Sequence, residues 1–215
     1  MKNITLYVIR HGETYLNKYK KMQGWSDAPL TEKGIKEAVK TGERLKNVSF
    51  DAIYASDLGR TKATAELIRN ENVVNNAVPI IPLKELRETF YGSLDGSFAH
   101  EVYQRIAKKL EIHEEDLFKT LSLHELAEEI KGLDAYHDAE TMNEVTSRLT
   151  AGLNYILESA KEHDSRIMVV THGNIIRTLV SMLDPTVNVQ RELKNSGITT
   201  IAFHGNDGEI IGFDE

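Results

Sequence analysis

The chain has 215 residues, of which 40% are hydrophobic and 27% charged, and its formal net charge at pH 7 is −7. This composition is typical of a soluble globular protein, and the length fits one large domain, because domains usually span roughly 100–200 residues. The absence of cysteine excludes disulfides, thiolate nucleophiles, cysteine-ligated zinc and iron–sulfur clusters. The acidic balance argues against a nucleic-acid binder, and no apolar run approaches the roughly 18 residues of a membrane helix.

The first predicted element is a strand that ends in polar residues. Apolar residues 6–9 precede Arg10, His11, Gly12 and Glu13. This apolar stretch is too short for a secretory signal, so we expect no export and a cytoplasmic location. Because a strand interior does not tolerate unpaired charges, Arg10 and His11 should project from the carboxyl end of the strand into a cleft.

The chemistry of these residues suggests phosphoryl transfer. The planar fork of Arg10 fits phosphate, and His11 beside it can act as a nucleophile or a proton carrier. Gly12 is expected to permit a sharp turn or a close approach to a ligand. The alternative for this segment alone is a strand that simply ends in polar residues.

The next pattern along the chain is helical. Residues 30–34 open a helix, and its apolar face is expected to hold Ile35, Ala38, Gly42 and Leu45. A strand at residues 52–55 then precedes a second helix, which Ser56 or Asp57 can cap. The stripe of this second helix is expected to include Ala63, Leu67 and Ile68.

Three further apolar runs, at residues 78–83, 167–170 and 198–203, predict strands, and Pro79 and Pro82 place the first of them at an edge. Residues 98–157 are helical in pattern, and their stripe of Leu117, Leu121 and Leu126 indicates packing. Alternating strands and helices predict an α/β fold with a largely parallel sheet wrapped on both faces. In such sheets ligands bind outside the carboxyl ends of the strands.

Four groups of residues able to carry chemistry follow four predicted strands. Arg10 and His11 follow the first, and Arg60 lies in the helical turn after the second. Glu88 comes shortly after the third, and His172 follows residues 167–170. We therefore expect all of them to converge at one edge of the sheet. A surface arginine and a local ion pair are the alternatives for Arg60 and Glu88, but a cation at a helix start is unfavourable unless an anion lies there.

Five motifs occur in a fixed order along the chain. They are Arg10-His11-Gly12-Glu13-Thr14, Gln23-Gly24-Trp25-Ser26-Asp27-Ala28-Pro29-Leu30-Thr31, Ser56-Asp57-Leu58-Gly59-Arg60-Thr61, Leu86-Arg87-Glu88 and Thr171-His172-Gly173. With them the chain resembles the histidine phosphatase superfamily, the phosphoglycerate mutase-like proteins. Ala139-Glu140-Thr141, ahead of Val145 and Arg148, also looks like the helix that follows the variable insert of that family.

The resemblance implies a single domain over residues 1–215, a three-layer α/β sandwich with a variable helical insert at about 93–138 over the site. It also implies a phosphohistidine intermediate and no metal or organic cofactor. His11 would be the nucleophile and Glu88 the proton donor to the leaving group. The phosphoryl oxygens would be held by Arg10, Arg60 and His172. Asn17 and the backbone of Gln23 and Gly24 match family positions that touch the phosphoryl group or the substrate.

Elementary acid–base chemistry agrees with these roles. An imidazole is a nucleophile only when neutral, and its ordinary pKa is about 6.5, so His11 is usable near neutral pH. His172, surrounded by phosphate charge, would prefer to be protonated. Glu88 can donate a proton only if burial or nearby anions raise its pKa.

We expect a phosphatase that acts on a small phosphomonoester and binds neither nucleic acid nor membranes. The alternatives are a phosphoglycerate mutase, a phospholigand-binding protein without turnover, and a metallohydrolase. Mutases that the chain resembles carry an arginine pair in the middle segment and a C-terminal tail over the site. Here the chain ends at Glu215, and the middle segment offers scattered cations, Arg105, Lys108, Lys109, Lys119 and Lys131.

Six histidines lie in no pattern and are interpreted as surface or interface residues, namely His100, His113, His124, His137, His163 and His204.

Overall fold

The computed structural model describes residues 3–160, 164–205 and 207–215. Strands and helices alternate along most of the chain, with short 3-10 turns between some of them. In order, the elements are β1 (Asn3–Arg10), α1 (Tyr15–Lys18), α2 (Glu32–Leu45), β2 (Ala52–Ser56), α3 (Gly59–Asn70), β3 (Ile80–Leu83), η1 (Lys84–Leu86), η2 (Gly92–Leu94), α4 (Ala99–Leu110), η3 (Glu114–Asp116), α5 (Leu117–Thr120), α6 (Leu123–Leu133), α7 (Met142–Ser159), β4 (Ser165–Thr171), α8 (Gly173–Leu183), β5 (Ile198–His204) and β6 (Asp207–Gly212).

The strands form one sheet in the order β3-β2-β4-β1-β5-β6. Neighbours from β3 to β1 are parallel, whereas β5 pairs antiparallel with β1 and β6 pairs antiparallel with β5. The predicted largely parallel sheet is therefore confirmed, and β3, which contains Pro82, lies at an edge as expected. Strand β6 is an addition to the predicted strands, because its residues alternate between exposed and partly exposed positions and form no apolar run.

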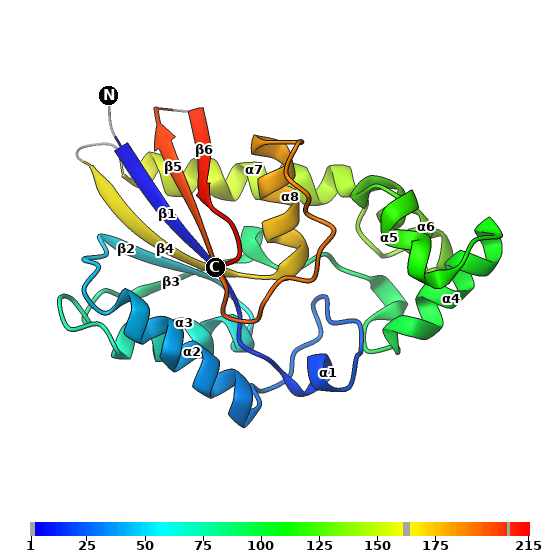
Figure 1. The fold of residues 1–215 in the computed structure, drawn as a ribbon, viewed down its shortest axis with the longest axis horizontal. Coiled ribbons are helices and arrows are strands. Elements are labelled where there is room, and N and C mark those ends of the chain that lie inside the picture. Colours follow the sequence, from blue (N-terminus) through cyan, green and yellow to red (C-terminus); the bar gives the residue numbers. More distant parts are fainter. Residues whose placement is uncertain (1–2, 161–163, 206) are drawn as a thin grey trace.

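Two hydrophobic clusters sandwich the sheet, because successive side chains of a strand point to opposite faces. Leu6 and Val8 of β1 pack with residues of α7 and α8, whereas Ile9 packs in a second cluster with residues of α2 and α3. Figure 1 shows α7 and α8 along one face of the sheet and α2 and α3 along the other. The three-layer α/β architecture is thus confirmed.

Helix α2 begins at the expected place, since the Thr31 hydroxyl accepts a hydrogen bond from the Gly34 N–H at 3.0 Å. One residue of its predicted apolar face is wrong: Ile35 is 42% exposed. The first turn packs through Gly34, where a Cβ would lie 2.2 Å from the Glu13 carbonyl oxygen, and Ile35 borders a surface groove instead. The other predicted members of this face are buried, namely Ala38, Gly42 and Leu45.

The start of α3 also differs from the prediction. Neither Ser56 nor Asp57 caps this helix, because the Asp57 carboxylate is paired with Arg87 at 2.6 Å. Instead Asp27, from a distant loop, accepts hydrogen bonds from the N–H groups of the first two helical residues at 2.6 and 3.4 Å. A tertiary contact therefore replaces the local cap. Of the predicted stripe Ile68 is buried, while Ala63 and Leu67 are partly exposed along the groove that Ile35 borders.

The insert, residues 93–138, packs around its own hydrophobic cluster. Leu117 and Leu126 are buried there and Leu121 packs against them, which confirms the predicted packing role of this stripe. Figure 1 shows α4, α5 and α6 to one side of the sheet, beyond the ends of β1 and β4. No helix within the described ranges is long and apolar enough to cross a membrane.

Five of the six histidines outside the motifs are exposed, in agreement with their interpretation as surface residues. His163 lies outside the described residues. The exposed ones are His100, His113, His124, His137 and His204.

The two ends of the insert are joined through the carboxylate of Asp134. It accepts hydrogen bonds from the Ser93 N–H at 3.0 Å and the Ala139 N–H at 2.8 Å, and the Ser93 hydroxyl also donates to it. Burial opposes ionisation of this carboxyl, but the hydrogen bonds outweigh it and hold its pKa well below the usual range. The ionised Asp134 therefore stabilises the base of the insert.

Replacing Asp134 with asparagine should lower the free energy of unfolding by about 1–3 kcal/mol at pH 7. Because the folded-state pKa is depressed, this stabilisation is fully present above the unfolded pKa of about 3.9 and is lost as the pH falls below it. Urea unfolding of both proteins at pH 7, 5 and 3.5 measures the difference. A difference that stays constant down to pH 3.5 would contradict this account.

Candidate active site

The residues predicted to converge do lie together at the carboxyl edge of the sheet. Arg10 ends β1 and His11 follows it, while His172 joins β4 to α8. The rings of His11 and His172 are 5.2 Å apart between centroids. Arg60, in the first turn of α3, lies between them, with Nε 3.3 Å from His11 Nε2 and Nη2 3.0 Å from His172 Nδ1. The site therefore combines two imidazoles with two guanidinium groups.

His11 is held in the tautomer that a nucleophile needs. Its Nδ1 lies 2.8 Å from the Gly12 carbonyl oxygen, and because a carbonyl only accepts, Nδ1 carries the hydrogen. The lone pair is therefore on Nε2. Burial, and then the charges of Arg60 and Arg10, lower the pKa of His11 well below its ordinary value. The ring is neutral at neutral pH, as nucleophilic attack requires.

Gly12 makes a close approach, but to the chain itself. A Cβ on Gly12 would lie 2.7 Å from the Gly34 carbonyl oxygen in the first turn of α2. The Gly12 N–H donates to the Thr64 hydroxyl at 3.0 Å. At this position glycine is required by the packing of α2 against the end of β1, and a close approach to a ligand stays a prediction.

Arg60 is fixed by acceptors around its guanidinium, and its side chain is fully buried. The Nη1 atom donates to the Ser26 carbonyl at 2.9 Å and to the Asp27 carboxylate at 3.1 Å, and Nη2 donates to the Gly24 carbonyl at 2.7 Å. Asp27 is thus the anion that a cation at a helix start requires. Asp27 belongs to a motif of the sequence analysis, but nothing in its spacing predicted that it would pair with Arg60.

The ring of His172 is neutral in the free protein, while its protonation beside a bound phosphate stays a prediction. Arg60 Nη2 donates to its Nδ1, so this nitrogen carries no hydrogen, and the ring is neutral. Burial, then the neighbouring Arg60 charge, lowers the pKa of His172 well below its ordinary value. Without a bound anion, cations outweigh anions around the ring. Its buried Nε2 has no hydrogen-bond partner among the described residues, so one donor is available to a ligand.

Arg10 carries a second available donor. Its Nη1 donates to the Leu193 carbonyl, but its Nε is buried and has no partner within the described part of the chain. Leaving a buried donor unpaired is costly unless a ligand pairs with it. Arg10 Nε and His172 Nε2 are therefore suited to bind anionic oxygens.

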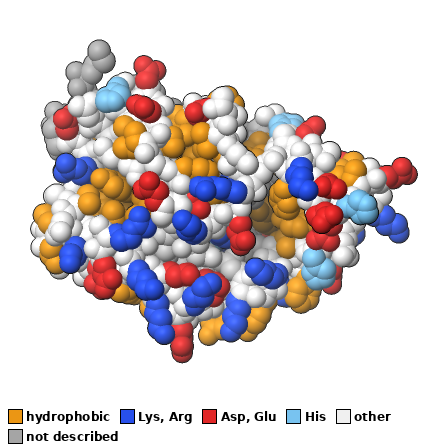
Figure 2. Space-filling view, viewed as in Figure 1, with side chains coloured by type: hydrophobic (Ala, Val, Ile, Leu, Met, Phe, Trp, Pro, Cys, Tyr) orange, Lys and Arg blue, Asp and Glu red, His pale blue; other side chains and the backbone are white. Residues whose placement is uncertain are grey.

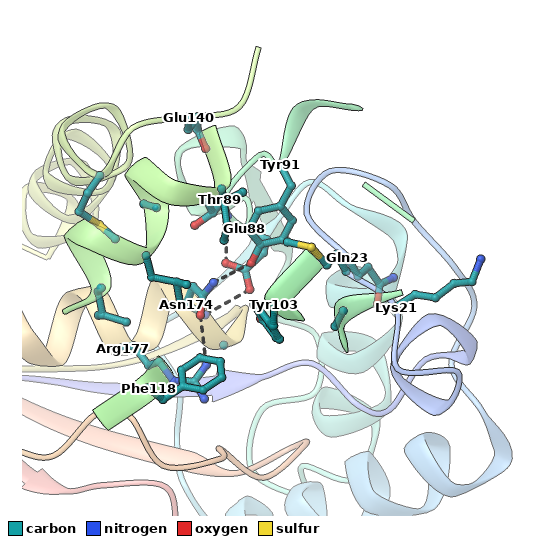
Figure 3. Close-up of a pocket in the computed structure, with 18 of the residues that line it drawn as sticks. Lys21, Gln23, Glu88, Thr89, Tyr91, Tyr103, Phe118, Glu140, Asn174 and Arg177 are labelled. Carbon is teal, nitrogen blue, oxygen red and sulfur yellow. Dashed lines mark hydrogen bonds between the residues drawn. The ribbon is translucent and has the colours of Figure 1, made fainter. Parts of the chain in front are cut away.

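Glu88 is a buried carboxyl near both arginines. Its oxygens accept from the Thr89 N–H at 2.9 Å and the Asn174 N–H at 3.1 Å (Figure 3). Burial raises the pKa of Glu88, and these hydrogen bonds and the arginine charges only partly offset it. Burial is one of the two causes of a raised pKa that the sequence analysis names for this carboxyl. Asn174, which the sequence analysis missed although it follows His172-Gly173, also donates to the Tyr91 hydroxyl at 2.7 Å.

The other predicted substrate-binding residues, Asn17, Gln23 and Gly24, differ in where they lie relative to the cavity. Asn17 lines the cavity beside His11, and its Oδ1 also accepts from the Thr14 N–H as part of the cap of α1. Gln23 lines the same cavity with an Nε2 that has no partner among the described residues. The Gly24 N–H donates instead to Asp95 at 2.9 Å, and its carbonyl accepts from Arg60. Gly24 thus supports Arg60, and a contact between its backbone and the substrate stays a prediction.

A cavity of about 230 Å³ extends from His11, Arg10 and Glu88 towards the insert. Figure 2 shows this face hollowed beside the insert, with hydrophobic side chains along the hollow. Cations outside the insert, Lys21 and Arg177, also line the cavity. None of the five lysines and arginines of residues 93–138, all of them described, lines it. The insert instead contributes apolar side chains, including Phe118, Leu123, Leu126, Ala127 and Ile130.

The site contains nitrogen and oxygen donors, but their arrangement is not that of a metal centre. In residues 3–160, 164–205 and 207–215, no three histidine, aspartate or glutamate side chains gather so that they could hold a metal ion. Both imidazoles face the guanidinium of Arg60, which repels cations. The geometry fits an anionic ligand.

Fold and site together define a three-layer α/β protein with two histidines and two arginines gathered at the carboxyl edge of its sheet. The family model of the histidine phosphatase superfamily (branch 1) matches residues 6–214. The chain belongs to this superfamily, whose members are phosphatases or mutases.

The similar proteins include some named as mutases and some named as phosphatases. A protein named "Probable phosphoglycerate mutase GpmB" from Erwinia tasmaniensis is 32% identical over 89% of this chain and 80% of its own length. The "Uncharacterized phosphatase PhoE" of Bacillus subtilis is 30% identical over 91% of this chain and 86% of its own length. A crystal structure of phosphoglycerate mutase from Bacillus anthracis superposes with a TM-score of 0.94 at 31% identity, covering 100% of this chain and 94% of that one. The family is thus certain, while the specific activity is a matter of proposal.

Proposed function

We propose that the protein is a phosphatase that hydrolyses small phosphomonoesters through a phosphohistidine at His11. The observation that carries this proposal is the apolar wall of the cavity, because no cation of the insert borders it. A mutase must hold its substrate while the phosphoryl group moves between two hydroxyls, and mutases that resemble this chain do so with arginines of the insert. An apolar wall fits the organic part of an ester that is released after the first step.

In the first proposed step, His11 Nε2 attacks phosphorus and the bond from phosphorus to the ester oxygen breaks. Glu88 gives its proton to that oxygen, so the product leaves as a neutral alcohol. Arg10, Arg60 and His172 hold the phosphoryl oxygens, and the two arginines offset the charge of these oxygens. The Arg60 N–H that faces His11 Nε2 in the free protein turns to a phosphoryl oxygen as the nitrogen becomes bonded to phosphorus.

In the second step, a water molecule attacks the phosphorus of phospho-His11. The Glu88 carboxylate, which gave up its proton in the first step, takes one from this water. The bond from phosphorus to Nε2 breaks, inorganic phosphate leaves, and the neutral imidazole of His11 is restored. Gln23 Nε2 and Asn17, which border the cavity, are proposed to contact the phosphoryl group.

Incubation with 3-phosphoglycerate separates the phosphatase from the mutase. The phosphatase should release inorganic phosphate and form little 2-phosphoglycerate, measured by phosphate assay and by nuclear magnetic resonance of phosphorus. Rapid isomerisation with little release would establish the mutase, which the Bacillus anthracis structure favours as the second candidate. If 3-phosphoglycerate is inert, a panel of phosphomonoesters with apolar groups replaces it, and phosphate release from any of them supports the proposal.

A chromogenic phosphate ester tests the two remaining alternatives. Turnover that persists in a strong chelator supports metal-independent hydrolysis, whereas loss that added metal restores would establish a metallohydrolase. Binding of esters without turnover would indicate a phospholigand-binding protein.

A further inference from the structure

The ion pair between Arg148 of α7 and Glu140, just ahead of that helix, has no part in the steps above. Arg148 Nε donates to Glu140 Oε1 at 2.6 Å and Nη2 donates to Oε2 at 2.8 Å, a parallel two-bond geometry. The two side chains are only 17% and 13% exposed. A well-shielded bidentate pair is rigid, and so it can fix whatever else it binds.

The same guanidinium also donates hydrogen bonds to the backbone of the segment that carries Glu88. Arg148 Nη1 donates to the carbonyl oxygens of Glu85 at 3.0 Å and Arg87 at 2.6 Å, and Nη2 donates to that of Glu88 at 3.0 Å. With the two bonds to Glu140, all five N–H donors of Arg148 are used. No donor is left for a substrate, so Arg148 acts only through the residues that it holds.

Glu140 also binds the backbone that follows Glu88. Its Oε2 accepts from the Phe90 N–H at 2.9 Å, and its own N–H donates to the Phe90 carbonyl at 2.9 Å. The indole N–H of Trp25 adds a further bond to the Glu88 carbonyl at 2.9 Å. Residues 87–91 form neither helix nor strand, so these bonds replace the ladder that would otherwise position Glu88.

We propose that Arg148 and Glu140 are positioning residues for the Glu88 carboxyl in proton transfer. This inference rests on the proposed function, since it takes Glu88 as the general acid. The backbone on both sides of Glu88 is fixed by the ion pair, and its carboxyl is thereby held against the N–H groups of Thr89 and Asn174. Proton transfer needs the donor within hydrogen-bond reach of the ester oxygen, and small displacements lower the rate steeply.

The test uses esters that differ in their need for a proton. 2,4-Dinitrophenyl phosphate expels its leaving group unaided, whereas phenyl phosphate requires the acid. For Arg148→Lys and Glu140→Gln, we expect kcat/KM to fall about 10–100-fold with phenyl phosphate and less than about 3-fold with the dinitrophenyl ester. The control Arg105→Lys, at an exposed position of the insert, should change neither value. Equal losses with both esters, or no loss with either, would overturn the proposal.

A double-mutant cycle separates positioning from a general effect on the fold. When Glu88 is already glutamine, adding Glu140→Gln should cause no further loss that depends on the leaving group, because the acid is absent. A full additional loss would contradict the proposal. Its failure is distinguishable from failure of the proposed function: in the first case the wild type still forms a phosphohistidine and releases phosphate, and in the second it does not release phosphate.

Discussion

Replacing His11 with alanine should lower the rate of phosphomonoester hydrolysis by at least about 10⁴-fold, because the nucleophile is removed and no second group replaces it. Two features of the free protein support this magnitude. The His11 ring is neutral, since burial and then Arg60 lower its pKa, and its Nε2 is the nitrogen without a hydrogen. Hydrolysis of a chromogenic ester by both proteins measures the loss.

The same variant must also lose the covalent intermediate. Wild type quenched during turnover should carry an acid-labile phosphoryl group on His11, and His11→Ala should carry none. His124→Ala, which removes an exposed imidazole of α6, is the matched control and should keep both the rate and the adduct. Equal rates for wild type and His11→Ala, or an adduct on another side chain, would refute the assignment of His11.

The sequence was sufficient to predict the convergence of the site, and the reason lies in the sheet. Arg10 and His172 each follow an apolar run, and the two strands β1 and β4 are parallel neighbours with Arg10 paired in register to Thr171. Residues that follow parallel strands must meet at one edge, whatever the loops between them do. The convergence of Arg10, His11 and His172 could therefore be predicted without tertiary information.

Contacts between distant loops could not be predicted in this way. Asp27 caps α3 and pairs with Arg60 although 33 positions separate them, and no local pattern marks such a partner. The partner of Gly12 proved to be Gly34, again a tertiary contact. The neutral state of His172 also depends on burial and on the Arg60 charge, which a sequence does not give.

The contacts of Arg148 and Glu140 with the segment that carries Glu88 could not be predicted from the sequence either. In the sequence Glu140 and Arg148 stand out only as part of the resemblance, because a residue ahead of a helix and a residue within it need no special role. Their proposed role depends on the number of N–H donors that Arg148 has and on the atoms that accept from them. Positioning of this kind is carried by backbone carbonyl groups, which every residue possesses and which no sequence motif records.

Replacing Glu88 with glutamine should lower kcat/KM for phenyl phosphate by about 10²–10⁴-fold, because an amide cannot give a proton to the leaving oxygen. The pH profile should change in a defined direction. In wild type, kcat/KM falls on the acid side as His11 takes up a proton, at a pKa well below 6.5, and on the alkaline side as Glu88 loses one, at a pKa raised above 4.5 by burial. The variant should retain the acid limb and lose the alkaline limb.

Ionisation of the substrate itself does not confuse this result. The second pKa of the phosphate group, about 6, contributes equally to the profiles of wild type and variant, so the limb that disappears belongs to the protein. Glu101→Gln, at an exposed position of α4, serves as the control and should leave the profile unchanged. An alkaline limb that persists in Glu88→Gln would assign the acid to another group, and a loss of equal size with 2,4-dinitrophenyl phosphate would show that Glu88 acts in binding rather than in proton transfer.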